Sequence, residues 1–185
     1  MMRAGITLIL LLTFSLVQAE NVGTGLTSAL FRFGLAYPTE TYNPSFGFNL
    51  GVIPLTPASN LKLGADITYW KVKYDYYQRK DNPNDDIKLR NVGANFSFYF
   101  YPLGMEGREF DIYFGGGLAI NYYTTDYPDG WPEKDKSKTN LEPHLDFGFE
   151  YPITRELKAN IHTRYTLSDT DTFLLLFGAI FTIGK

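Results

Sequence analysis

Eight stretches of the chain alternate apolar and polar residues with a period of two, and groups of turn residues separate them. A period of two places successive side chains on opposite faces of a β-strand, so the pattern predicts an all-β fold. Most stretches run for about 9 to 15 residues, whereas strands of soluble domains usually have about 5 or 6 and membrane-spanning strands need about 9–11. The stretches are Leu26–Tyr37, Ser45–Ile53, one that starts at Leu61 and blurs past Trp70, Ile87–Tyr101, Phe110–Thr125, Leu141–Tyr151, Leu157–Leu167 and Phe173–Ile183.

The polar face of these stretches is rich in Gly, Asn and Ser, has scattered charges of both signs, and contains few Lys or Glu residues. The clearest example is Ile87–Tyr101, where apolar residues alternate with Asn91, Gly93, Asn95, Ser97 and Tyr99. Lys and Glu would dominate a surface in water, so we expect the polar face to line a narrow, packed interior and the apolar face to meet lipid. A soluble barrel of the lipocalin type is the alternative. The mean hydropathy of −0.18 fits both, because alternating strands average to mild values.

The N-terminal segment Met1–Ala19 has the pattern of a signal peptide. Arg3 supplies the positive region, and the apolar run Ile6–Val17 is shorter than the roughly 20 residues of a spanning helix. Val17-Gln18-Ala19 has the small residues of a cleavage site. We predict cleavage after Ala19, with residues 20–185 forming the barrel domain; an uncleaved anchor is the alternative. No later apolar run is long enough to span as a helix, so a membrane location would require a closed barrel.

The connections between the stretches differ in charge and length. Gln78–Asp86 and Asp126–Thr139 are charged and rich in Pro or Gly, as extracellular loops are. Alternation then assigns Pro38–Pro44 and Ser168–Thr172 to the same side, and Pro54–Asn60, Pro102–Glu109 and Pro152–Glu156 to the periplasmic side. Aromatic residues near the strand ends fit either an interfacial belt or simple β-propensity. They are Tyr37, Tyr42, Tyr69, Trp70, Tyr99, Tyr101, Tyr122, Tyr123, Tyr151 and Tyr165.

Several short sequence segments resemble those of one group of protein families. They are Phe96–Pro102 (FSFYFYP), Tyr113–Ile120 (YFGGGLAI), Phe147–Pro152 (FGFEYP) and Phe177–Gly184 (FGAIFTIG). With the eight stretches, they resemble the small outer-membrane β-barrel families, which include the OmpA-type transmembrane domain and the OmpX and OmpW types. The resemblance implies an eight-stranded antiparallel up-and-down transmembrane β-barrel in the bacterial cell outer membrane. Its partners would be outer-membrane lipid, lipopolysaccharide and the outer-membrane assembly machinery, and we expect a monomer. Such families usually end in an aromatic residue, whereas here Phe181 is recessed.

Charged residues of both signs fall on the polar face and are therefore predicted to point inward. The cations Arg32, Lys62, Lys158 and Arg164 oppose Asp66, Asp111, Glu142, Asp146 and Glu150. Side chains can fill an eight-stranded barrel, and buried charges require partners. We therefore predict an ion-paired plug that closes the barrel; a narrow conducting path or gate is the alternative. The predicted interior polar network consists of Arg32, Asp66, Glu142, His144, Asp146, Glu150, His162 and Arg164.

Other kinds of chemistry find little support in the sequence. The chain has no Cys and a formal charge of −3, without the clustered Lys and Arg of a nucleic-acid site. His144 and His162 lie on the polar face with Glu142 and Asp146, but such residues are expected there, so we predict no metal and no cofactor. Lipid A deacylase barrels have a Ser two residues after the His, whereas Arg164 follows His162 here, and Ser97 has no evident base. We predict a non-enzymatic protein with a structural or surface-interaction role. A small pore or hydrophobic-solute conduit and a lipid A-modifying enzyme are the alternatives.

Overall fold

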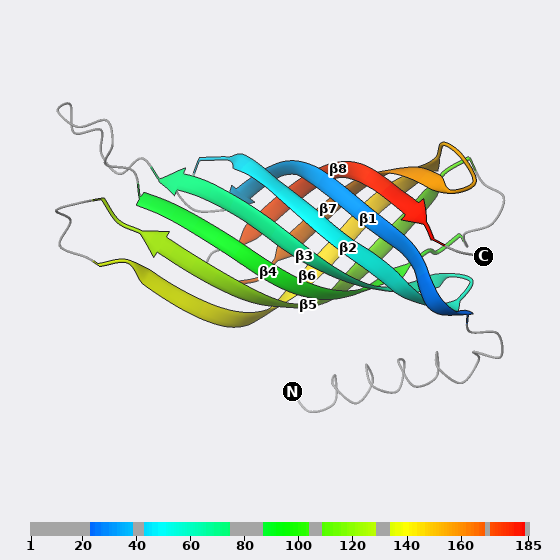
Figure 1. Ribbon diagram of the computed structural model, residues 1–185, viewed down its shortest axis with the longest axis horizontal. Coiled ribbons are helices and arrows are strands. Elements are labelled where there is room, and N and C mark those ends of the chain that lie inside the picture. Colours follow the sequence, from blue (N-terminus) through cyan, green and yellow to red (C-terminus); the bar gives the residue numbers. More distant parts are fainter. Residues whose placement is uncertain are drawn as a thin grey trace.

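The computed structural model describes residues 23–38, 43–74, 87–103, 109–128, 134–168 and 171–183, with side chains from Ser28 onward. They form eight β-strands in one closed barrel of order β1-β2-β3-β4-β5-β6-β7-β8 (Figure 1), as the sequence predicts. The strands are β1 (Gly23–Pro38), β2 (Ser45–Ala58), β3 (Leu61–Tyr74), β4 (Ile87–Phe100), β5 (Asp111–Asp126), β6 (Lys136–Pro152), β7 (Leu157–Thr166) and β8 (Thr172–Thr182). The predicted signal peptide and its cleavage site lie outside the described residues. No helix among the described residues is long and apolar enough to cross a membrane.

Every strand pairs antiparallel with the next, and β1 closes the barrel against β8. Phe33 of β1, for example, stands opposite Phe48 of β2 on one side and Phe177 of β8 on the other. Closure removes unpaired sheet edges, which lipid is unable to satisfy. We call the end with the connections after β1, β3, β5 and β7 the loop end. The opposite end, where β1 starts and β8 finishes, is the turn end (Figure 1).

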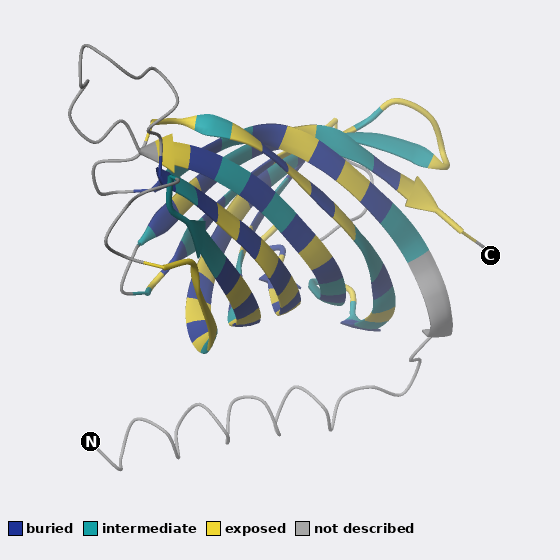
Figure 2. Cartoon of the chain, turned by 60° about the vertical axis from the view of Figure 1, so that its left-hand side comes forward, coloured by how far each residue is buried: buried dark blue, intermediate teal, exposed yellow. Residues whose placement is uncertain are grey.

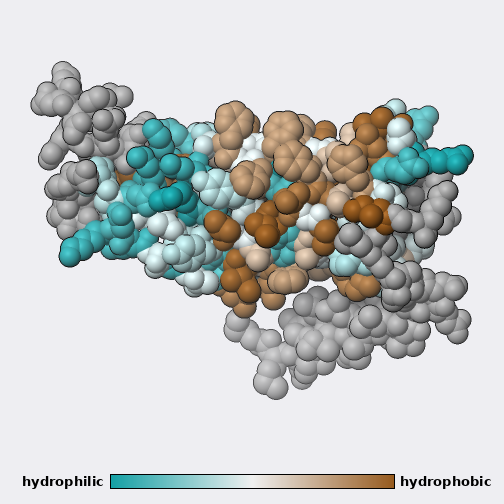
Figure 3. Space-filling view, in the orientation of Figure 1, coloured by the Kyte–Doolittle hydropathy of each residue, from teal (hydrophilic) through white to brown (hydrophobic). Residues whose placement is uncertain are grey.

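Burial alternates along the strands, as Figure 2 shows by its bands of buried and exposed residues. In β4 the alternation is unbroken from Ile87 to Phe100. Large apolar side chains point outward, among them Phe96 at 61% exposure and Leu145 at 61%. In Figure 3 the apolar side chains gather along the middle of the visible face, with hydrophilic side chains toward both ends. The outward surface thus has the polarity of a membrane-spanning barrel.

The first turn is much shorter than the sequence indicates. The predicted turn Pro54–Asn60 is wrong, because β2 continues to Ala58 and only Ser59 and Asn60 separate it from β3. The register of β2 against β3 shifts between Val52 and Leu55 and again between Leu55 and Ala58. Such irregularities tolerate proline, which has no N–H to donate to the ladder. At the loop end, likewise, β6 begins at Lys136, inside the predicted loop.

The blurred pattern past Trp70 has a structural cause. Trp70 and Val72 point inward and are 1% and 0% exposed, so the inward face of β3 becomes apolar near the loop end. They belong to an apolar layer inside the barrel, made of Ala36, Trp70, Val72, Leu89, Tyr123, Leu174 and Leu176. The interfacial-belt interpretation is therefore wrong for four aromatic residues, which are buried in the interior: Trp70, Tyr99, Tyr101 and Tyr123.

Glycine on the inward face makes room for the buried tyrosines. Gly148 of β6 stands opposite Tyr113 of β5. A Cβ at position 148 would lie 2.1 Å from Cζ of Tyr113, so only glycine lets this ring cross the interior. The Tyr113 ring then packs edge-on against Tyr99, with 5.2 Å between the ring centroids. Glycine therefore serves close packing here, as it does elsewhere in strands.

Candidate functional site

The centre of the barrel holds an arginine bound by two aspartates from different strands. Arg164 of β7 donates to both carboxylate oxygens of Asp66 on β3, at 2.9 and 3.0 Å. Its Nε also donates to Oδ1 of Asp146 on β6 at 2.8 Å. The side chains of all three residues are at most 2% exposed. Since β3 and β7 are not neighbours in the barrel, this fork-shaped contact bridges the lumen.

Neutral side chains complete the coordination of Asp66. Asn49 of β2 and Asn95 of β4 donate to its Oδ1, and the Thr68 hydroxyl donates to the same atom at 3.3 Å. A buried carboxylate with this many donors loses little of the stabilisation that water would give it. The Asp66 carboxylate is therefore fully hydrogen-bonded within a network that spans the lumen.

Arg32 of β1 lies in the same network but contacts amides in place of carboxylates. Its Nε donates to Oδ1 of Asn160 at 2.6 Å, and NH1 donates to Oδ1 of Asn49 at 3.3 Å. The residue is 1% exposed. Its charge is balanced within the cluster, because two arginines face two aspartates there.

The two histidines flank Asp146. Nε2 of His144 lies 3.0 Å from the Ser97 hydroxyl and 3.4 Å from Oδ2 of Asp146. Nδ1 of His162 lies 2.8 Å from the Tyr113 hydroxyl, and its Nε2 lies 3.5 Å from Oδ1 of Asp146. Nδ1 of His144 and Nε2 of His162 have no hydrogen-bond partner among the described residues.

The contact between Ser97 and His144 is one that the sequence did not reveal. It does not form a nucleophilic relay, because the same nitrogen, Nε2, faces both the serine and Asp146. A relay needs the acid on the opposite ring nitrogen. Arg164 also donates to the Ser97 hydroxyl at 3.1 Å, in a buried position closed to substrate. No group of three metal-ligating side chains occurs within the described part of the chain.

A second charged cluster closes the turn end. Nζ of Lys158 lies 2.8 Å from Asp111 and 3.0 Å from Glu150. Nζ of Lys62 lies 3.3 Å from Glu150 and donates to the Tyr101 hydroxyl at 2.9 Å. The side chain of Lys62 is 12% exposed and that of Lys158 is 25% exposed, whereas Glu150 is 1% exposed. This cluster therefore lies closer to water than the central one.

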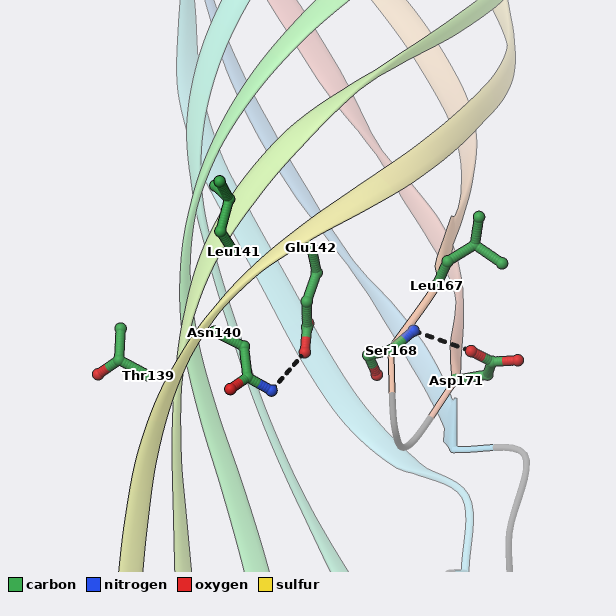
Figure 4. Close-up of a pocket in the computed structure, with 7 residues that line it drawn as sticks. All are labelled: Thr139, Asn140, Leu141, Glu142, Leu167, Ser168 and Asp171. Carbon is green, nitrogen blue, oxygen red and sulfur yellow. Dashed lines mark hydrogen bonds between the residues drawn. The ribbon is translucent and has the colours of Figure 1, made fainter. Parts of the chain in front are cut away.

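Glu142 lies apart from both clusters, near the loop end. Its carboxylate accepts hydrogen bonds from Asn121 at 2.7 Å, Tyr123 at 2.6 Å and Asn140 at 2.9 Å. It borders an open hollow of about 630 Å³ between β6 and the β7–β8 connection (Figure 4). The lining residues are Thr139, Asn140, Leu141, Glu142, Leu167, Ser168 and Asp171.

The β7–β8 connection at this hollow is held by Asp171. Its carboxylate accepts a hydrogen bond from the Tyr165 hydroxyl at 2.6 Å and another from the Ser168 backbone N–H at 2.9 Å. These two donors, the tyrosine first, lower the pKa of Asp171 below its ordinary value. The hollow is thus bordered by two carboxylates that both have hydrogen-bond donors.

The structure places all eight residues of the predicted polar network in the barrel interior, each at most 5% exposed. It joins Arg164, Asp66 and Asp146 directly and adds the histidines beside them, whereas Glu150 and Glu142 lie in separate clusters. Sequence analysis missed the apolar layer around Trp70. The signal was available, because strict alternation from Asp66 places both Trp70 and Val72 inward.

This closed barrel with a packed interior has the fold of the small eight-stranded β-barrels of bacterial outer membranes. No protein-family model and no curated protein matches the chain. Among solved structures, Neisserial surface protein A has a TM-score of 0.59 at 17% identity, over 89% of this chain and 100% of that one. OprG from Pseudomonas aeruginosa has a TM-score of 0.58 at 13% identity, over 88% and 99%. Ail of Yersinia pestis has a TM-score of 0.52 at 10% identity, over 85% and 99%.

Proposed function

We propose that this chain is an integral protein of the bacterial outer membrane, exported by a signal peptide that is cleaved after Ala19. Its barrel acts as a closed anchor, and its role is structural or consists of surface interactions through the loop end. The observation that supports this most is the reversed polarity of the barrel, apolar outside and charged within. Soluble monomers rarely expose continuous apolar patches larger than a few hundred Å².

The loop end is assigned to the cell surface. Two charged segments connect strands at this end: Gln78–Asp86, outside the described residues, between β3 and β4, and Asp126–Thr139, described in part, between β5 and β6. The first strand, β1, begins at the turn end and the last, β8, finishes there, as expected for a chain that enters the membrane from the periplasm.

The membrane location is tested with the full chain expressed in a Gram-negative host. We expect the protein in the outer-membrane fraction, resistant to carbonate extraction, with faster gel migration before heating than after. A soluble periplasmic protein without a heat-dependent shift would contradict the proposal. Mass spectrometry should also find Glu20 at the mature N-terminus.

Closure of the lumen is tested separately in planar bilayers. The filled centre, with Arg164 bound across the lumen to Asp66, predicts no steady ohmic conductance. Steady channels would instead support a small pore or a hydrophobic-solute conduit. Mass spectrometry of lipid A with and without expression should give identical spectra; a changed spectrum would support the lipid A-modifying alternative.

A further inference from the structure

Four cations meet on the outer surface of the barrel where β3 ends and β4 begins. In the register of these strands, Lys71 stands opposite Arg90 and Lys73 opposite Lys88. Val72 and Leu89, which lie between them along the chain, are buried in the interior, so the four cations point outward. We call Lys71, Lys73, Lys88 and Arg90 the outward basic patch. Like charges directly opposite each other destabilise a sheet unless something neutralises them.

A carboxylate of β5 neutralises part of this patch. Arg90 forms an ion pair with Asp126 of β5, which also stands opposite Lys88 in the register. Among the described residues, no carboxylate lies within ion-pair distance of Lys71 or Lys88. Lys71, Lys88 and Arg90 together with Asp126 have a net charge of +2 on this surface. The connecting segment 75–86, outside the described residues, contains four Asp residues, Arg79 and Lys80. Its carboxylates are therefore an alternative to an external anion as partners of the patch, and the variants below distinguish the two.

The position of the patch relative to the apolar belt identifies the kind of ligand. The outward residues of β3 from Leu61 to Tyr69 are apolar or aromatic, as are those of β4 from Phe100 to Val92. Eight residues rise roughly 26 Å along a strand, or roughly 20 Å in height at the usual tilt, which is close to the apolar height of an outer-membrane barrel. Lys71 and Arg90 therefore lie just beyond the apolar belt, at the height where the acyl chains end. In Figure 1, β3 finishes and β4 starts at this end of the barrel, and Figure 3 shows hydrophilic side chains there.

A phosphorylated lipid headgroup satisfies both requirements, since it brings anions to this height and acyl chains to the belt below. Val92 and Ile67, exposed at 46% and 55%, offer the adjoining apolar surface. Lys and Arg bind phosphate oxygens through charge-assisted hydrogen bonds. We propose that the outward basic patch binds phosphate groups in the headgroups of outer-leaflet lipopolysaccharide. This inference rests on the proposed membrane location and orientation.

The experiment uses the mature chain refolded in vesicles of phosphatidylcholine that contain diphosphorylated lipid A, with enzymatically dephosphorylated lipid A as the comparison. Native mass spectrometry measures lipid A bound to each released barrel. We expect roughly tenfold tighter binding of the phosphorylated form, because each cation near an anionic headgroup contributes measurably to affinity.

Matched variants separate the patch from overall charge. The double variant Lys71→Gln/Lys88→Gln should remove most of the preference for phosphate, a loss of roughly fivefold or more. The control Lys134→Gln/Arg155→Gln makes the same change in net charge at exposed cations outside the patch, and should bind like the parent. Asp126→Asn should strengthen binding, because it removes the carboxylate paired with Arg90.

Each remaining outcome has a defined meaning. Equal binding of both lipid A forms, or an equal loss in the control variant, would overturn the inference. Unchanged affinity for lipid A in Lys71→Gln/Lys88→Gln would mean that segment 75–86 neutralises the patch, and it would also overturn the inference. Patch-dependent binding of inorganic phosphate with no preference for lipid A would identify free phosphate as the ligand. A barrel that inserts normally and fails these tests leaves the proposed function intact, whereas a chain that never inserts defeats the proposed function itself.

Discussion

The two ends of the barrel interior are filled by different chemistry. Toward the turn end, Lys62 and Lys158 pair with Glu150, and the central Arg164 binds two aspartates. Toward the loop end, the apolar layer around Trp70 and Leu176 occupies the interior, and the buried Glu142 carboxylate accepts a hydrogen bond from Tyr123 at the edge of this layer. Polar contacts depend on exact partners and on the local dielectric, whereas apolar packing depends on volume. Ion pairs therefore predominate toward the turn end, beside the smaller apolar cluster of Leu30, Ile53 and Ile180, whereas apolar packing predominates toward the loop end.

The largest effect is expected where the charges are most deeply buried. Arg164→Ala would leave Asp66 and Asp146 buried without their cation, and breaking a buried ion pair in this way costs about 3–5 kcal/mol. The measurement is urea unfolding in vesicles, followed by the heat-dependent gel shift. Arg155→Ala, at an exposed cation of the β6–β7 turn, is the control and should change little. A loss below about 1 kcal/mol would mean that the central network contributes little to stability.

At the loop end the corresponding change is Trp70→Ala. It removes a side chain that is 1% exposed and packs against Tyr123 with 6.1 Å between the ring centroids. We expect a loss of about 3 kcal/mol, from lost burial and the cavity left behind. The loss should change little between low and high salt, because the Trp70 side chain itself forms no ion pair. Tyr69→Ala, on the outward face of the same strand, is the control. An effect that depends strongly on salt would contradict the apolar description of this end.

Glu150→Gln tests the turn end and should have a smaller effect. It removes the shared carboxylate of Lys62 and Lys158, which are already 12% and 25% exposed. We expect a loss of about 2 kcal/mol at low ionic strength, which decreases in high salt because water and ions reach these lysines. Glu156→Gln, in the exposed turn nearby, is the control. Equal losses at all salt concentrations would place this cluster in the same dry environment as the centre.

The smallest effect concerns the β7–β8 connection at the loop end. The Tyr165 hydroxyl and the Ser168 N–H lower the pKa of Asp171. A carboxyl whose pKa is lowered by folding stabilises the folded form above its unfolded pKa and loses this contribution as pH falls through the folded value. Protection of the Ser168 amide from hydrogen exchange should therefore decrease in acid, relative to the Asp171→Asn variant at each pH. Identical protection in both proteins at neutral pH would show that the contact does not hold this connection.

Much of the fold could be predicted because alternation is a local property. β4 starts at the predicted residue and finishes one residue earlier than predicted, and β8 starts and finishes one residue earlier than predicted. The first turn was missed because Pro54 and Pro57 usually end strands, and only pairing with β3 shows that irregular register accommodates them. The interior location of Trp70 was missed because an aromatic residue near a strand end fits a membrane interface equally well.

By itself, the sequence determined which face of each strand is apolar, and therefore that a closed barrel would place its charges inside. The tertiary structure alone decided which charges meet. Arg164 and Asp66 are 98 residues apart and come from strands that are not neighbours. Their contact depends on the tilt and stagger of all eight strands, which set the residues that share one height in the lumen. The pairing of β3 with β4 likewise placed Lys71 opposite Arg90 and Lys73 opposite Lys88, so register, rather than any local motif, created the outward basic patch.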